Sequence, residues 1–192
     1  GITATTFSPH FKRHVVLDAS PAVISNFQKR YPNAQIDIIE CYFENFETEE
    51  RFDIIVLGYI LEHVDDPKLI LEKFKKFLKP SGRIFITVPN AEVLNRKLGH
   101  LAGMLDNMQE LSDHDLLLGH KRYYTVDSLK DDVESSGYHI ENIEGIYLKP
   151  LTTRQMLSLK LHKNIIDALC QVGVKYPELS CGIFLEARLK IK

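Results

Sequence analysis

An acidic residue at the end of a short apolar run is the first feature of this sequence that points to chemistry. Asp18 directly follows Val15-Val16-Leu17. A carboxylate at the end of a strand in a doubly wound nucleotide-binding fold accepts hydrogen bonds from ribose hydroxyls. Asp18 could instead lead the helix that we expect to begin after Ser20. The residues alone leave both roles for Asp18 open.

Two further segments carry side chains that can move protons or bind charge. Glu62 and His63 follow an apolar run, and His120 and Arg122 lie in a polar segment near the middle of the chain. A histidine has an ordinary pKa of about 6.5, so His120 can accept a proton from a hydroxyl or an amine. The guanidinium of Arg122 can hold an anionic group. Each pair could instead fix its own loop through backbone contacts, and this alternative stays open.

Strands that alternate with amphipathic helices must position these residues. This order predicts an α/β fold with a doubly wound, mostly parallel sheet that helices cover on both sides. We also expect two late strands to pair antiparallel at one edge. The expected strands are 15–17, 36–39, 52–57, 83–88, 140–148 and 182–189, and the expected helices are 21–31, 66–78, 125–137 and about 156–172.

Length and composition exclude several classes of protein. The 192 residues suit one domain, which we expect to span residues 1–192 with an inserted cap at about 91–124. The net charge of −2 gives no reason to expect nucleic acid as a partner, and no apolar run is long enough for a membrane helix. Three widely spaced cysteines fit free thiols, so we expect a cytoplasmic location. The oligomeric state cannot be predicted.

Three features in order resemble the class I S-adenosylmethionine-dependent methyltransferases, over almost the whole chain. The first is the run that ends at Asp18, and the second is Phe52–Gly58 with the following Tyr59-Ile60-Leu61-Glu62-His63-Val64. The third is Leu78-Lys79-Pro80-Ser81-Gly82-Arg83-Ile84 together with Val88-Pro89-Asn90. The resemblance implies methyl transfer from S-adenosylmethionine to an oxygen or nitrogen of a small-molecule acceptor. It also implies a Rossmann-like fold of the methyltransferase type.

The glycine-rich loop that follows the first strand of this family is not visible in the sequence. Counting back from Asp18 places Gly1 at the last glycine of that loop, and residues 2–11 would then form the next helix. We therefore expect the first strand, which is central in this fold, and most of the loop to be missing upstream of Gly1. Gly1 could equally have no counterpart in the family.

The resemblance also assigns residues to the cofactor. Asp18 would bind the ribose hydroxyls and Ala19 would lie beside the adenine. Tyr42, Phe43 and Glu44 occupy the segment that meets the adenine ring, although Tyr42 replaces the usual aspartate and Phe43 could simply be core. The methionine portion of the cofactor would lie against a segment near the end of a later strand, which contributes Gly58, Tyr59 and Leu61.

The Glu62-His63 pair raises the question of a metal. In some relatives a glutamate three residues earlier joins such a pair to bind a divalent ion. That position is Tyr59 here, so we expect no metal. Glu62 and His63 would then either organise the turn into the next helix or contribute to catalysis, with His63 as the candidate catalytic residue.

The expected cap region should choose the acceptor, because loops on a rigid scaffold usually carry specificity. Its segment Gly119–Thr125 resembles a turn found in small-molecule methyltransferases, with His120 as the candidate catalytic base. Arg122 and Asn90 are the candidate substrate-binding residues. Two alternatives remain, namely a nicotinamide-dependent oxidoreductase, which shares the ribose-binding acid, and a cofactor-binding module without turnover.

Overall fold

A computed structural model describes residues 1–190 of the protein. These residues form two compact units, Gly1–Glu49 and the remainder from Glu50 onward, so the expected single domain is described in two parts. The elements of the first unit are α1 (Ile2–Phe7), the short 3-10 helix η1 (Ser8–His10), β1 (Val15–Asp18), α2 (Pro21–Arg30), β2 (Asp37–Glu40) and η2 (Phe43–Asn45).

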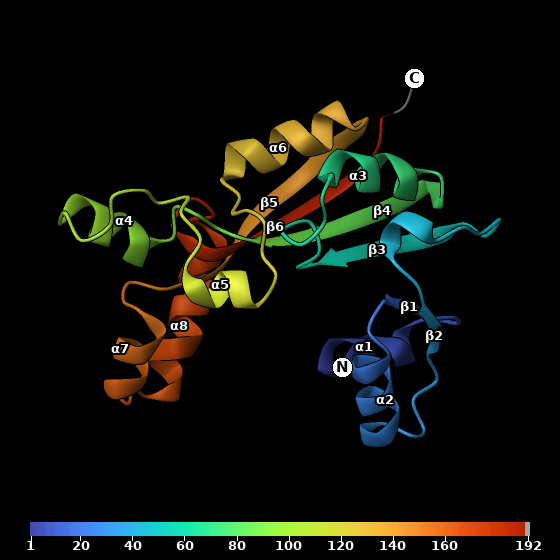
Figure 1. The fold of residues 1–192 in the computed structure, drawn as a ribbon, viewed down its shortest axis with the longest axis horizontal. Coiled ribbons are helices and arrows are strands. Elements are labelled where there is room, and N and C mark those ends of the chain that lie inside the picture. The colour runs from blue at the N-terminus through green and yellow to red at the C-terminus, as the bar shows by residue number, and fades with distance from the viewer. Residues whose placement is uncertain (191–192) are drawn as a thin grey trace. The chain divides into compact units, whose positions relative to one another are not determined.

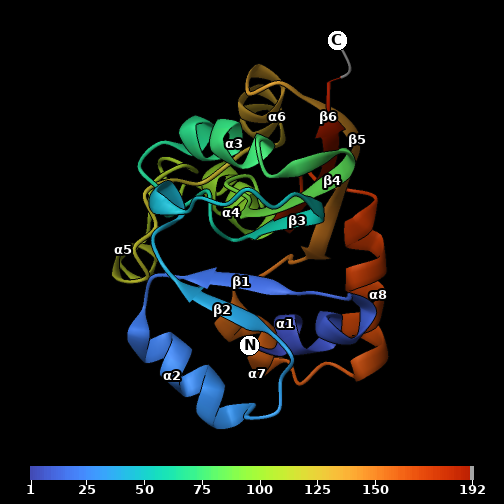
Figure 2. The same ribbon diagram turned by 90° about the vertical axis from the view of Figure 1, so that its right-hand side faces the viewer.

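The first unit is built on two parallel strands. β1 pairs with β2 from Val15 opposite Asp37 to Asp18 opposite Glu40 (Figure 2). α2 begins as the sequence predicts, because the Ser20 side chain accepts a hydrogen bond from the backbone amide of Val23. Pro21 then occupies the first helical position, where no amide donor is needed. These contacts fix the point at which the chain leaves Asp18.

The second unit holds the longer strands and the remaining helices (Figure 1). Its elements are β3 (Phe52–Gly58), α3 (Pro67–Lys75), β4 (Leu78–Pro89), α4 (Leu94–Leu101), α5 (Asp113–Leu117), α6 (Val126–Ser135), β5 (Tyr138–Leu148), α7 (Thr153–Ser158), α8 (Lys163–Val174) and β6 (Ser180–Leu189). Within residues 1–190, no helix is long and apolar enough to cross a membrane.

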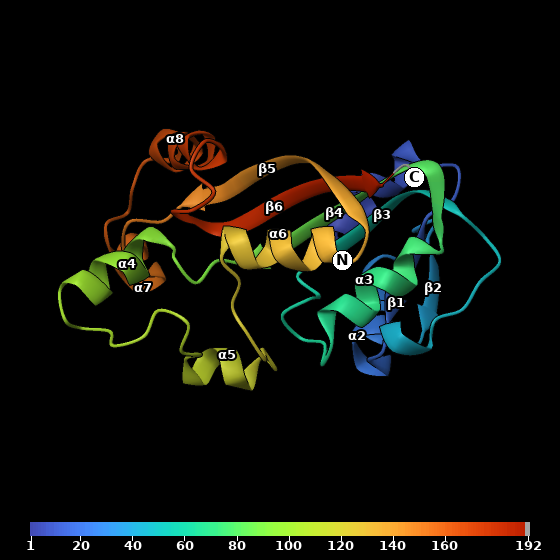
Figure 3. The same ribbon diagram turned by 90° about the horizontal axis from the view of Figure 1, so that it is seen from above.

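The sheet of the second unit has the order β3-β4-β6-β5. β3 and β4 are parallel, whereas β6 runs antiparallel to both of its neighbours. The expected antiparallel pair of late strands is therefore confirmed, with β5 at the edge. α3 and α6 lie along one face of the sheet (Figure 3). Their core residues Leu71 and Leu129 are fully buried, as are Ile84, Ile86 and Leu185 of the strands.

The boundary between α3 and β4 differs from the expected one. The apolar spacing predicted a helix through Leu78, but the helix ends at Lys75 and Leu78 pairs with Phe52 of β3. Both Phe77 and Leu78 are buried, so the apolar pattern continues across the boundary without a break. The pairing resumes at Arg83 opposite Ile54, and the intervening Lys79–Gly82 stretch forms an irregularity in the strand.

The expected helix at about 156–172 is two helices, α7 and α8. Lys160 lies between them in the left-handed backbone region, with φ 46°, which no helix tolerates in its interior. The expected cap region, 91–124, contains α4 and α5, and its end returns to the sheet because Tyr124 bridges to Asn90. This return brings His120 back towards the loop that follows β3.

Candidate functional site

The first unit places Asp18 and Gly1 in the wall of one cavity of about 410 Å³. Asp18 ends β1, and its Oδ1 accepts a hydrogen bond from the backbone amide of Ser20 at 2.8 Å. Most of the remaining lining is apolar, including Val16, Phe27 and Ile38. The contact with Ser20 corresponds to the helix-leading role that the sequence left open, and it engages one of the two carboxylate oxygens.

The other residues assigned to the cofactor in this unit lie next to β1 or after β2. Ala19 follows Asp18 directly, and Tyr42 is 65% exposed. Phe43 and Glu44 begin the short helix η2. Phe43 is only partly buried. Its burial therefore does not support the alternative that it is only a core residue.

In the second unit, the loop after β3 departs from the extended backbone immediately. Tyr59 has φ 57°, and its amide donates to the carbonyl of Thr87 at 2.9 Å. A non-glycine residue in this region is strained and often marks a functional segment. Leu61 is fully buried, and its side chain forms part of the core.

Arg122 and Asn90, the two predicted substrate-binding residues, both donate hydrogen bonds to backbone carbonyls. Arg122 donates from Nη1 to the carbonyls of Leu61 (2.8 Å) and Val64 (2.5 Å), and from Nη2 to that of Asp65 (3.0 Å). These bonds pin the loop that carries the Glu62-His63 pair, as in the alternative that the sequence left open.

Asn90 is 2% exposed, and its side-chain amide donates to three carbonyls around the start of β6, those of Pro177, Glu178 and Ser180. Its Oδ1 accepts from the amide of Glu92. The side chain therefore joins the end of β4 to the start of β6, which is a structural role.

Glu62 is the most unusual titratable group of the second unit. Its side chain is fully buried, and neither carboxylate oxygen has a hydrogen-bond partner in the structure. Burial disfavours the charged form and raises the pKa of Glu62 to about 7. A buried polar group without a partner costs free energy and often marks a functional site. The sequence alone left Glu62 between a structural role in the turn and a catalytic one.

Two histidines lie beside this carboxylate. The rings of His63 and His120 meet edge to face, with centroids 4.8 Å apart. Nδ1 of His63 lies 3.2 Å from the carbonyl of Gly119, to which it can donate. Burial, followed by the neighbouring His63, lowers the pKa of His120 below its usual value. The structure thus brings together the two histidines that the sequence predicted as catalytic.

The same cluster has ligand types that occur in metal sites. One ligand atom from each of Glu62, His63 and His120 lies within 4.8 Å of the others. One carboxylate and two imidazoles suit zinc better than magnesium, which prefers oxygen ligands. We expected no metal because Tyr59 occupies the position of the third ligand. His120 was not considered as a ligand, because it lies far from His63 in the sequence.

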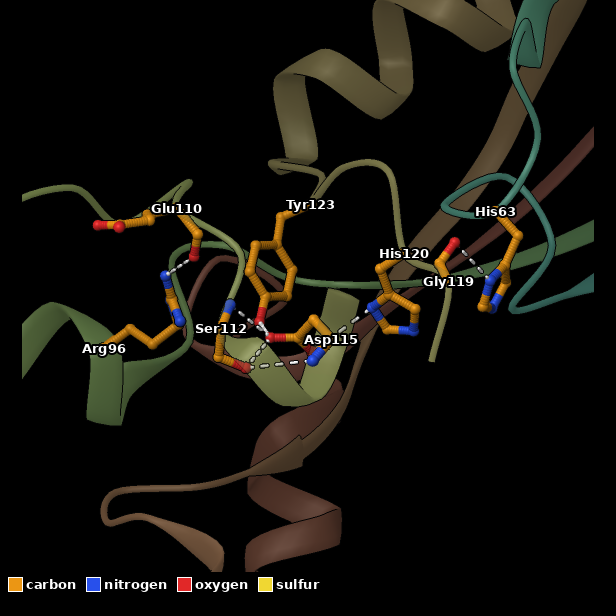
Figure 4. Close-up of polar contacts among 8 residues, drawn as sticks. All are labelled: His63, Arg96, Glu110, Ser112, Asp115, Gly119, His120 and Tyr123. Atoms are coloured by element: carbon orange, nitrogen blue, oxygen red, sulfur yellow. Dashed lines mark hydrogen bonds and ion pairs between the residues drawn. The ribbon is translucent and has the colours of Figure 1, made fainter. Parts of the chain in front are cut away.

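An aspartate that the sequence analysis missed lies on the other side of His120 (Figure 4). Oδ1 of Asp115 is 3.5 Å from Nδ1 of His120, and both side chains are 14% exposed. Asp115 belongs to a capping box with Ser112 at the start of α5. The Ser112-x-x-Asp115 spacing was the available sequence signal, but it indicates only a helix start.

Comparison with known proteins decides the family. A family model described as "Methyltransferase domain" matches residues 1–143, about three quarters of the chain. The chain belongs to this methyltransferase family. The family and the Rossmann-like fold that the sequence predicted are therefore confirmed.

Two relatives of this methyltransferase domain are ubiquinone biosynthesis O-methyltransferases. The mitochondrial protein of Dictyostelium discoideum is 26% identical over 138 residues, covering 70% of this chain and 42% of the relative. The protein of Aeromonas salmonicida is 29% identical over 122 residues, covering 62% of this chain and 47% of the relative. The methyltransferase domain thus spans about half the length of the curated relatives it matches.

A solved structure supports the fold. The N-methyltransferase NodS from Bradyrhizobium japonicum, in complex with S-adenosyl-L-homocysteine, has a TM-score of 0.58 and 14% identity. The similarity covers 97% of this chain and 71% of NodS. At this identity the likeness concerns the arrangement of strands and helices only.

Proposed function

We propose that this methyltransferase domain transfers a methyl group from S-adenosylmethionine to an oxygen or nitrogen of a small-molecule acceptor. The observation that carries the proposal is the family match over residues 1–143. Relatives named as O-methyltransferases and a fold neighbour named as an N-methyltransferase support this reaction class. The cytoplasmic location expected from the cysteines stays a prediction.

Bound S-adenosylmethionine supplies a methyl group on a positively charged sulfur, which is already a strong electrophile. An acceptor oxygen or nitrogen would take this methyl group, and the electron pair of the carbon–sulfur bond would stay with the sulfur. The protein therefore has to orient the acceptor, exclude water and take up the acceptor's proton. We propose His120 as the group that takes up the proton, with His63 beside it.

The roles proposed for the cofactor residues follow the resemblance. Asp18 would hold the ribose, with Gly1 and Ala19 near it and Tyr42, Phe43 and Glu44 near the adenine. Gly58 and Tyr59 would lie against the methionine portion. Asp18 ends β1 in the first unit and Gly58 ends β3 in the second, and the ends of parallel strands are where ligands of α/β sheets bind.

Calorimetric titration of the full-length protein with S-adenosylhomocysteine tests the cofactor. We expect Asp18→Ala to weaken binding by about 10- to 150-fold, the equivalent of roughly 1.5–3 kcal/mol for a hydrogen bond to a charged group. Asp37→Ala is the matched control, because Asp37 begins β2 and pairs with the exposed Arg13. Binding of NAD in place of S-adenosylhomocysteine would favour an oxidoreductase instead.

Turnover is tested separately, by the formation of S-adenosylhomocysteine with a panel of phenols and primary amines. Binding without turnover across the panel would favour a cofactor-binding module.

The proposed reaction needs no metal, because the sulfonium is activated without a Lewis acid. We therefore expect activity to survive dialysis against a chelator that also removes zinc. The cluster of Glu62, His63 and His120 makes this measurement decisive. Loss of activity on chelation with recovery on adding zinc or magnesium would assign the cluster to a metal and contradict the expectation.

A further inference from the structure

Asp115 is held in one orientation by contacts to one of its two oxygens. Oδ2 accepts hydrogen bonds from the amide of Ser112 (3.0 Å), from the Ser112 hydroxyl and from the hydroxyl of Tyr123 (2.5 Å). Burial by itself raises the pKa of Asp115, but the hydrogen bonds from Ser112 and Tyr123 together lower it below its usual value. Oδ1 takes no part in these bonds and is the oxygen that faces His120.

The support behind Asp115 extends to α4. The Arg96 guanidinium lies over the Tyr123 ring, 4.8 Å from its centroid. Arg96 also donates to the carbonyls of Met108 and Glu110, at distances between 2.7 and 3.0 Å. The Tyr123 hydroxyl therefore reaches Asp115 from a ring that is itself fixed (Figure 4). A charged group held this way can set the orientation of its neighbour.

The backbone also fixes His120 relative to Asp115. The amide of His120 donates to the carbonyl of Asp115 at 2.9 Å, so the main chain fixes the spacing of the two residues. Nδ1 of His120 is buried and makes no hydrogen bond in the structure, and Oδ1 of Asp115 lies 3.5 Å from it. A neutral imidazole carries its proton on one nitrogen only, and a carboxylate beside Nδ1 favours the form that has the proton there.

We propose that Asp115 is a positioning residue that holds His120 with its proton on Nδ1, so that Nε2 is free to accept the proton of the methyl acceptor. The role of His120 rests on the proposed function, whereas the tautomer is a property of the protein itself. No covalent chemistry occurs at Asp115. The proton leaves the acceptor atom and adds to Nε2, while Asp115 balances the charge of the imidazolium.

The competing explanation is that Asp115 only caps α5. Two variants separate the explanations. Asp115→Asn keeps an oxygen that can accept from Ser112 and Tyr123, but it places an amide donor beside Nδ1 of His120. Ser112→Ala is the matched control, because it removes the capping hydroxyl and leaves the carboxylate beside His120.

The tautomer is measured by ¹⁵N NMR of the imidazole nitrogens, with His120→Gln used to assign the signal. We expect the Nδ1-protonated form in the native protein and in Ser112→Ala, and the Nε2-protonated form in Asp115→Asn. In the methyl-transfer assay we expect kcat of Asp115→Asn to fall by about 10²- to 10⁴-fold, the usual contribution of a general base. KM should change much less. Ser112→Ala should lose thermal stability but far less kcat than Asp115→Asn, because the Ser112 amide and the Tyr123 hydroxyl still hold Oδ2 of Asp115.

The native spectrum alone can overturn the proposal, even if Asp115→Asn does not fold. An Nε2-protonated His120 in the native protein would show that Asp115 does not set the tautomer. An unchanged tautomer and kcat in a folded Asp115→Asn would reduce Asp115 to a helix cap. A switched tautomer in a protein that transfers no methyl group would leave the positioning role intact and refute the proposed function.

Discussion

At the scale of single residues, the buried carboxylate of Glu62 has a consequence for stability. Its pKa is raised from 4.5 to about 7 in the folded protein, mainly by burial. As the pH rises above about 4.5, the unfolded chain loses this proton first, so the folded state loses stability until the pH passes about 7. The full penalty is on the order of 3 kcal/mol, from about 1.4 kcal/mol per pH unit of difference.

We therefore predict that Glu62→Gln removes this pH dependence. Compared with the native protein, the variant should gain melting temperature at pH 8 that it does not gain at pH 4.5, measured by calorimetry with chelator present. Glu72→Gln, which changes an exposed carboxylate on α3, serves as the control. An equal difference at both pH values would show that Glu62 is not a strained buried acid.

Single residues also show how far the sequence could predict the site. His63 and His120 were predicted separately, and the structure brings their rings together. Asp115 could not be found, because its helix-capping pattern says nothing about the histidine it faces. Arg122 and Asn90 were assigned to a substrate, but the side chains of both donate hydrogen bonds to backbone carbonyls. Residue type indicates what a side chain can do, whereas its partners depend on the tertiary fold.

At the scale of elements, most strands and helices were predictable, since apolar runs and caps are local signals. β1, β3 and α2 lie within a residue or two of their expected positions. The boundary at Lys75–Leu78 was not predictable, because buried residues on both sides continue one apolar pattern. The break between α7 and α8 was also missed, because it depends on the left-handed Lys160.

The packing of α8 against β5 depends on the absence of a side chain at Gly173. A Cβ added there would lie 2.8 Å from the amide nitrogen of Leu148 and 2.9 Å from that of Tyr147. Backbone atoms cannot move aside as a flexible side chain can. We predict that Gly173→Ala lowers the free energy of unfolding by about 1–3 kcal/mol, the usual cost of overpacking, as measured by urea denaturation.

Gly99→Ala is the matched control for this prediction. Gly99 lies in α4, and an added Cβ would meet only Leu105, at 3.8 Å. Since alanine favours a helix over glycine, this change should raise stability by up to about 1 kcal/mol. A similar loss of stability in both variants would show that the effect of Gly173→Ala does not come from the close approach of α8 to β5.

At the scale of the whole molecule, the doubly wound fold requires cover on both faces of a sheet. In the second unit α3 and α6 lie along one face (Figure 3). Along β3 the buried Ile55 and Leu57 alternate with Ile54 and Val56, which are 37% and 52% exposed. Alternate residues of a strand point to opposite faces. The second face of β3 is therefore apolar and open to solvent.

This open face is also at the edge of the sheet, because β3 is the first strand in the order β3-β4-β6-β5. An exposed apolar edge strand promotes association between molecules. We predict that a polypeptide of residues 1–192 self-associates, and that Ile54→Thr with Val56→Thr reduces this, as measured by light scattering against concentration. Threonine keeps the β-branched shape that suits a strand, so the fold should persist.

Met104→Thr is the control, because Met104 is 83% exposed and lies outside the sheet. If Met104→Thr reduces association as much as the double variant, or the double variant does not reduce it, association does not depend on the edge and open face of β3.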